Sequence, residues 1–126
     1  MGERDMSQPA VLGAGLGSAC FLDVETTGLS PRTDEVVELA MMLFEFDYST
    51  GEIAGIVDSY CGLREPSVPI HPGATRVHGL TLDDLRGERL DDQRVQSILT
   101  NANLLIAHNA RFDKPFVCRL FKQASQ

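Results

Sequence analysis

The chain has 126 residues, of which 43% are hydrophobic, so it is long enough to build one domain around a substantial core. Its 11 lysines and arginines stand against 18 aspartates and glutamates, and the formal charge of −7 argues against a protein that coats nucleic acid through a generic basic surface. The charge does not exclude a protein that meets phosphate through metal ions held by acidic side chains.

The N-terminal part is predicted to be a flexible leader followed by buried strands. Residues 1–18 are rich in glycine and polar groups and form the leader, and residues 19–126 form the N-terminal part of a single domain. Residues 20–24 are predicted to be a buried strand. Residues 36–46 are strongly apolar without a helical stripe, which favours a second strand.

A hairpin and a loop follow. Residues 49–52, Ser-Thr-Gly-Glu, provide a turn into a third strand over residues 53–63. Residues 65–72 contain three prolines and are predicted to be a loop.

The C-terminal half predicts helices around one short strand. Residues 81–84 fit a helix-capping pattern, and the apolar positions i, i+3, i+4 and i+7 of residues 95–102 indicate an amphipathic helix. Residues 104–107 form a short buried strand. The apolar spacing between residues 112 and 121 predicts a last helix, with Pro115 in its first turn.

Three carboxylates are the candidate chemical centre. Asp23 and Glu25 end the first strand two residues apart, so they share one face, and Asp113 follows the strand at 104–107. If the two strands lie parallel, all three arrive at the same edge of an α/β sheet. Hard oxygen ligands suit Mg²⁺ or Mn²⁺, and two such ions can clamp both oxygens of an in-line phosphoryl displacement.

The segments Asp23-Val-Glu-Thr-Thr-Gly28 and His108-Asn-Ala-Arg-Phe-Asp113 resemble the first two motifs of the DEDD superfamily of 3′–5′ exonucleases. That group includes the proofreading epsilon subunit of DNA polymerase III and ribonuclease T. Val77-His-Gly-Leu80, between them, resembles a family element that lines the nucleotide pocket. The resemblance implies a ribonuclease H-like α/β fold, a mixed sheet with flanking helices. It also implies hydrolysis of the 3′-terminal phosphodiester of single-stranded DNA or RNA.

The third motif of the family, a histidine followed four or five residues later by an aspartate, is not found after these two motifs and is expected beyond Gln126. We therefore expect a C-terminally incomplete domain that is weakly active or inactive alone. His78 and Asp83 have similar spacing, but they lie between the first two motifs, so neither is expected to be the base or the missing ligand. His108 is expected to support the site or to pack locally.

The resemblance also implies roles for particular residues. Asp23 would bridge two Mg²⁺ or Mn²⁺ ions, Glu25 would hold one of them, and Asp113 would hold the second partly through water. Seven residues are expected to bind the end of the substrate: Thr26, Thr27, Gly28, Leu29, His78, Asn109 and Phe112. For Leu29 and Phe112, packing in the core is an equal alternative. His78 is otherwise a surface turn residue, and Asn109 otherwise braces its turn.

Two rival functions stay open at this stage. One is a noncatalytic metal- or nucleotide-binding module, or an inactive fragment, because the third motif is missing. The other is a small-molecule phosphohydrolase.

The expected partners are a single-stranded 3′ end and, for a proofreading enzyme, a DNA polymerase. We also expect self-association through an exposed sheet edge at residues 104–107, with Phe116, Leu120 or Phe121 partly uncovered. Three cysteines without CxxC spacing and no membrane-length apolar run favour the cytoplasm and give no reason to expect a membrane.

Overall fold

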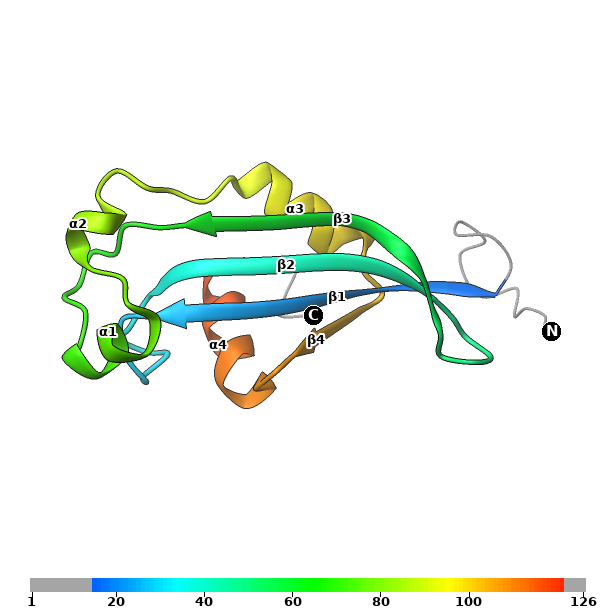
Figure 1. The fold of residues 1–126 in the computed structure, drawn as a ribbon, viewed down its shortest axis with the longest axis horizontal. Coiled ribbons are helices and arrows are strands. Elements are labelled where there is room, and N and C mark those ends of the chain that lie inside the picture. The colour runs from blue at the N-terminus through cyan, green and yellow to red at the C-terminus, as the bar shows by residue number, and fades with distance from the viewer. Residues whose placement is uncertain (1–14, 122–126) are drawn as a thin grey trace.

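The computed structural model describes residues 15–121, which form one four-stranded sheet in the order β3-β2-β1-β4. Strands β1 (Leu16–Thr26), β2 (Val36–Asp47) and β3 (Ile53–Leu63) are antiparallel neighbours. The short β4 (Leu104–Ala107) returns parallel to β1 (Figure 1). The carboxyl ends of β1 and β4 therefore lie at the same end of the sheet, as the sequence predicted.

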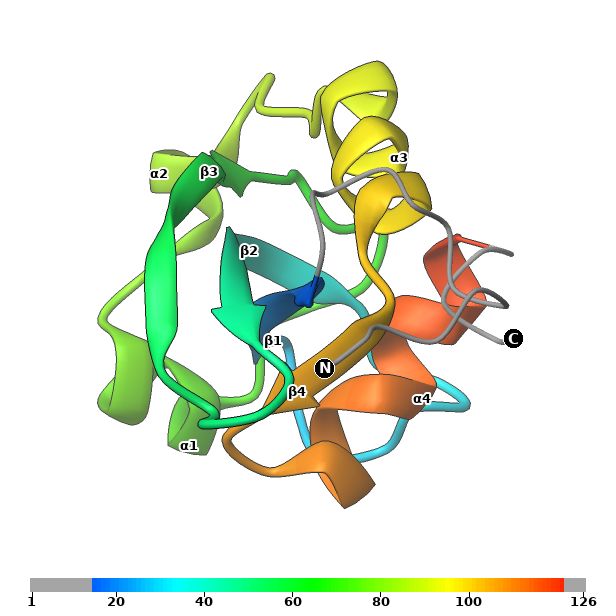
Figure 2. The same cartoon turned by 90° about the vertical axis from the view of Figure 1, so that its right-hand side faces the viewer.

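The described part of the chain contains four helices. Two of them, α3 (Asp92–Asn101) and α4 (Ala110–Leu120), cover one face, and within residues 15–121 the opposite face carries no long helix (Figure 2). The short α1 (Pro72–His78) and α2 (Leu82–Leu85) lie at the end of the molecule where β1 and β3 finish (Figure 1). None of the helices within residues 15–121 is long and apolar enough to cross a membrane.

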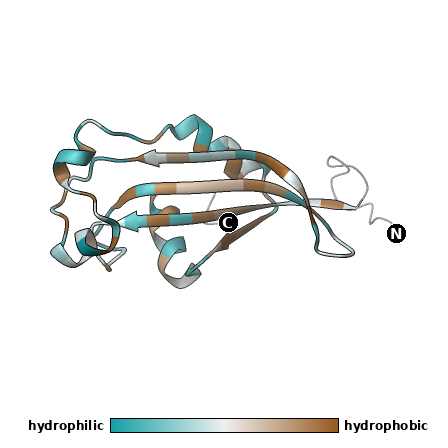
Figure 3. Ribbon diagram, in the orientation of Figure 1, coloured by the Kyte–Doolittle hydropathy of each residue, from teal (hydrophilic) through white to brown (hydrophobic). Residues whose placement is uncertain are grey.

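The core lies between the sheet and the pair α3 and α4. Alternate residues of β1 point into it, since Leu22 and Val24 are buried while Asp23 between them is exposed. Ile98 of α3 and Phe116 of α4 are almost fully buried against these strands. Figure 3 shows the apolar residues running along the middle of β1 and β2 and through β4.

Most predicted elements are present, and several of their boundaries differ by a few residues. The strand β1 begins at Leu16, so the last residues of the predicted leader are strand, while residues 1–14 lie outside the described part. Pro115 lies inside α4 rather than in its first turn, because that helix begins at Ala110.

Helix α1 was not predicted. Its proline-rich lead-in and its lack of any buried residue hide it from a search for apolar periodicity. The signals that could have found it are Pro72 at the first helical position and Gly79, which ends the helix with a left-handed φ of 76°.

The prediction of which apolar residues are left uncovered was wrong in part. Phe116 and Phe121 are 1% and 4% exposed, and Leu120 is half-buried, because α4 packs onto the covered face of the sheet. Exposed apolar residues instead include Phe21 and Met42 on the opposite face, which stand directly across from each other on neighbouring strands. β4 does form an edge of the sheet.

Candidate functional site

Asp23 and Glu25 leave β1 on the face of the sheet that α3 and α4 do not cover. Their neighbours Leu22 and Val24 point into the core, so the period of two places both carboxylates on the other side. Directly after Glu25 the pairing with β2 shifts register, which marks a bulge at the end of the strand. Such bulges re-aim the side chains beside them.

Asp113 reaches the same region from the first turn of α4. Its amide donates a hydrogen bond to the backbone oxygen of Asn109 at 2.8 Å, which fixes the start of the helix. The side chain is 3% exposed, and its Oδ2 has no hydrogen-bond partner within the described structure. A buried carboxylate oxygen without a donor is costly unless something positive meets it.

The pKa directions show that these carboxylates influence one another. Burial raises the pKa of Glu25, and the nearby charges of Asp23, Glu38 and Asp113 raise it further, while His78 lowers it. Burial also raises the pKa of Asp113, opposed by the Asn109 hydrogen bond, with Asp23 adding to the rise. Negative charge is therefore concentrated at the end of β1, where a cation would relieve it.

The donor set fits a hard divalent cation, since it consists of carboxylate oxygens with one orphaned buried atom among them. Asp23, Glu25 and Asp113 are the residues that could hold it. Within residues 15–121, no group of three or more His, Cys, Asp or Glu side chains already stands in an arrangement that could hold a metal ion. Side-chain movement would accompany binding.

A groove of about 810 Å³ opens beside Glu25, within the range of small-ligand sites. It lies between the end of β1, helix α1 and the start of α4. Six of the seven residues predicted to bind substrate line it together with Glu25: Thr26, Gly28, Leu29, His78, Asn109 and Phe112. Val77, from the element expected to line the pocket, is there too, and the lining residues not expected from the sequence are Val24, Ser30, Asp34, His71, Gly73 and Ala74.

Thr27 is the predicted residue that does not line the groove. Its side chain is fully buried, and its hydroxyl donates to Oδ1 of Asp34 at 2.9 Å and accepts from the amide of Glu35 at 3.0 Å. The Thr27 hydroxyl therefore stabilises the loop that follows β1.

His78 is held at both ring nitrogens. The amide of Leu80 donates to Nδ1 at 3.0 Å, so the proton is on Nε2, which lies 3.0 Å from the backbone oxygen of Thr26 and donates to it. The ring therefore ties α1 to the end of β1. Asp83 follows His78 with a spacing similar to that of the third motif, but it forms an exposed ion pair with Arg86 instead.

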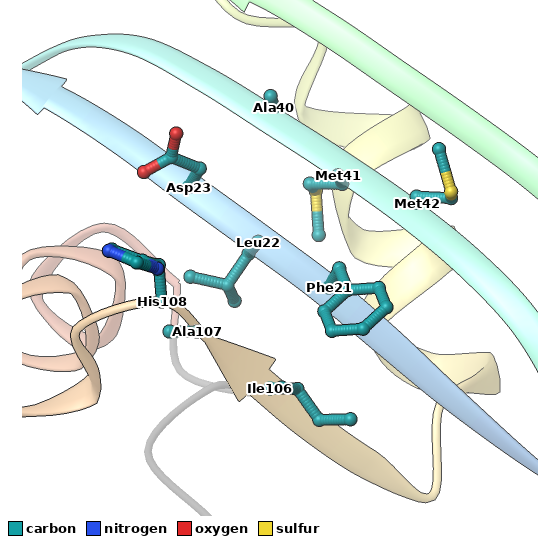
Figure 4. Close-up of a pocket in the computed structure, with 9 residues that line it drawn as sticks. All are labelled: Phe21, Leu22, Asp23, Ala40, Met41, Met42, Ile106, Ala107 and His108. Atoms are coloured by element: carbon teal, nitrogen blue, oxygen red, sulfur yellow. The ribbon is translucent and has the colours of Figure 1, made fainter.

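A second hollow of about 490 Å³ lies on the uncovered face of the sheet. Phe21, Met42 and Ile106 give it an apolar floor, and Asp23 stands at one end with His108 nearby (Figure 4). Asp23 is therefore at the boundary between an apolar surface and the acidic end of β1. His108 also lies close enough to Asp113 to lower the pKa of that carboxyl.

Comparison with known proteins agrees with this geometry. The RNase_T exonuclease family model matches residues 20–126. The PolC-type DNA polymerase III of Thermotoga maritima is 33% identical over 105 residues, which are 80% of this chain and 7% of that protein. The PolC-type DNA polymerase III of Listeria innocua is 32% identical over 100 residues, which are 78% of this chain and 6% of that protein. The chain thus spans only a small part of the length of these relatives.

Solved structures agree on the fold. Exonuclease I without ligand superposes with a TM-score of 0.66 at 22% identity, covering 84% of this chain and 24% of that one. The metal-free complex of Escherichia coli exonuclease I with single-stranded DNA gives the same TM-score, identity and coverage. The predicted ribonuclease H-like mixed sheet with flanking helices is confirmed.

Proposed function

The chain belongs to the RNase_T exonuclease family, and we propose that it is a metal-dependent 3′–5′ exonuclease domain acting on single-stranded nucleic acid. Asp23, Glu25 and Asp113 are the proposed catalytic carboxylates. The observation that carries the proposal is the groove, since Glu25 and six residues expected from the family motifs line one hollow at the end of β1.

The chemistry follows from what these residues can do. Asp23, Glu25 and Asp113 would hold Mg²⁺ or Mn²⁺, ions that when bound lower the pKa of an attacking water and stabilise a departing oxygen. A terminal nucleotide in the groove places its phosphodiester beside Glu25. Leu29, which is 84% exposed, and Phe112 offer apolar surface to the base from two sides of the groove.

His78 stabilises the structure of this site and does not act as its base, because both of its ring nitrogens already form hydrogen bonds. It holds the backbone of Thr26 against α1, so the wall that faces the sugar stays in place. We do not assign His78 as the group that accepts a proton from the attacking water.

We propose DNA as the substrate class, with a DNA polymerase as the partner. Both proposals are supported by the similarity to PolC-type DNA polymerase III, and the first also by the fold of exonuclease I, which has been solved with single-stranded DNA. A cytoplasmic location is consistent with these partners.

The experiment is a cleavage assay with Mn²⁺ and a single-stranded oligonucleotide labelled at its 5′ end. We expect slow trimming from the 3′ end, which shortens the labelled strand stepwise, and loss of that trimming in Asp23→Asn. The matched control Asp92→Asn changes an exposed acid on α3 and should trim like the wild type. Release of the label as a mononucleotide, or cleavage of a circular strand, would refute the assignment.

A noncatalytic nucleotide-binding module is the second candidate. Because the base of the family is expected in the third motif and His78 is engaged at both ring nitrogens, no proton acceptor is assigned within residues 15–121, and this favours the second candidate. This candidate predicts Mn²⁺-dependent binding of the oligonucleotide without any shortening of the strand. The same labelled substrate separates the two functions, because binding and trimming are read from one sample.

A further inference from the structure

Asp34 is a buried carboxylate at the groove that the proposed chemistry does not use. It is 5% exposed, its Oδ1 accepts from the Thr27 hydroxyl at 2.9 Å, and its Oδ2 accepts from the amide of Ser30 at 3.0 Å. Nε2 of His71 lies 3.3 Å from Oδ1. Arg119 of α4 donates to the backbone oxygen of Asp34 at 2.9 Å. The two hydrogen bonds to the carboxylate and the one to the backbone oxygen hold Asp34 in a fixed position.

The contacts of Asp34 and His71 join the two walls of the groove. Asp34 ends the loop that carries the exposed Leu29, and His71 is the residue directly before α1. The amide of His71 donates to the backbone oxygen of Thr27 at 2.8 Å. No space is left at Gly28, where a Cβ would lie 2.4 Å from Cδ2 of His71 and 2.5 Å from Oδ2 of Asp34. These contacts therefore fix the distance between the loop that carries Leu29 and helix α1.

We propose that Asp34 and His71 are positioning residues for recognition of the 3′ end. They hold the Leu29 loop and α1 in the arrangement that accepts a terminal nucleotide, and neither needs to touch the reacting phosphate. The inference rests on the proposed function of the groove. A loop released from this contact still binds a strand through its other contacts, but it no longer distinguishes an end from the interior of a strand.

The test compares His71→Leu with His71→Gln. Glutamine keeps an N–H donor near the position of Nε2, whereas leucine removes it. The side chain of His71 is 66% exposed and makes no capping hydrogen bond to α1, so neither change opens the core or removes a cap. Affinity is measured in Mn²⁺ for a linear single-stranded oligonucleotide, slowed by a terminal phosphorothioate, and for a circle of the same sequence.

We expect His71→Leu to bind the linear strand about tenfold more weakly than the wild type and the circle equally well, as for loss of one charge-assisted contact. His71→Gln should stay within about twofold of the wild type for both strands. Trypsin gives a second reading, since Arg32 is exposed in the same loop. Cleavage after Arg32, relative to the exposed Arg89, should quicken in His71→Leu only.

The outcomes separate two kinds of failure. If the wild type binds the linear strand and the circle equally, end recognition and this inference fall together. If the wild type prefers the linear strand and His71→Leu keeps that preference with unchanged cleavage after Arg32, the proposed function stands and the positioning role is overturned.

Discussion

At the scale of single residues, the ionisation of Asp113 has the clearest expected effect on the stability of the fold. Its buried Oδ2 has no donor in the described structure, and burial and the charge of Asp23 raise its pKa. A raised pKa means that the protonated form stabilises the fold. That stability is fully present below the unfolded pKa, about 4, and is lost as pH rises through the folded value.

We therefore expect Asp113→Asn to raise the melting temperature of the metal-free protein at neutral pH, with a gain of about 1 kcal/mol. The difference from the wild type should grow as pH rises from about 4 to 7. Mn²⁺ should raise the melting temperature of the wild type and leave the variant almost unchanged. Thermal melts at several pH values with and without Mn²⁺ check this, and a difference independent of pH would contradict it.

The residues at this scale were predictable to different degrees. Asp23 and Glu25 were placed correctly on one face because the period of a strand is two. Asp34 and His71 were missed because their importance depends on which loops meet. In the sequence Asp34 looks like an ordinary turn residue and His71 like part of a proline-rich loop. Only the tertiary contacts between them show the connection.

At the scale of elements, α4 binds the sheet through Phe116, which is 1% exposed in the core cluster. We expect Phe116→Ala to lower the free energy of unfolding by about 3–5 kcal/mol, since a large aromatic leaves a cavity. Leu104→Ala is the control, because Leu104 is 51% exposed and should cost well under half as much. Denaturant titration measures both, and equal costs would show that α4 is not packed as described.

Strands were predicted better than the short helices for a physical reason. The strands contain long apolar runs that must be buried, so their signal is local. Helix α1 buries no residue and is held by its histidines, Nε2 of His78 on Thr26 and the amide of His71 on Thr27. Nothing in its own composition indicates a buried face, so only its terminal proline and glycine gave a signal.

At the scale of the molecule, residues 15–121 leave one face of the sheet and the edge of β4 uncovered. Phe21 and Met42 are 44% and 40% exposed on that face, where they line the hollow that Asp23 borders. We expect weak self-association that strengthens with salt, because the charge of −7 makes two copies repel each other at low ionic strength. Light scattering over a salt series checks this, and Met42→Thr should reduce the association. A monomer at every salt concentration would contradict it.

The order of elements was compatible with an α/β sheet in which the first and last strands lie parallel, and the family resemblance supplied the ribonuclease H-like fold class. The choice of covered face was not predictable in the same way. Apolar residues occur on both faces of β1 and β2, so the pattern alone does not say which face the helices take. Because α3 and α4 cover the other face, Asp23 and Glu25 lie on the uncovered face of the sheet, and Asp113 reaches the same region from the start of α4.

We propose that Asp23, Glu25 and Asp113 form a divalent-metal site at the end of β1. Titration calorimetry with Mn²⁺ tests it most directly, on the wild type, on Asp23→Ala and on the exposed control Asp92→Asn. We expect the wild type and the control to bind Mn²⁺ with the same affinity and Asp23→Ala to bind it at least about tenfold more weakly. Equal affinity in all three proteins would contradict it.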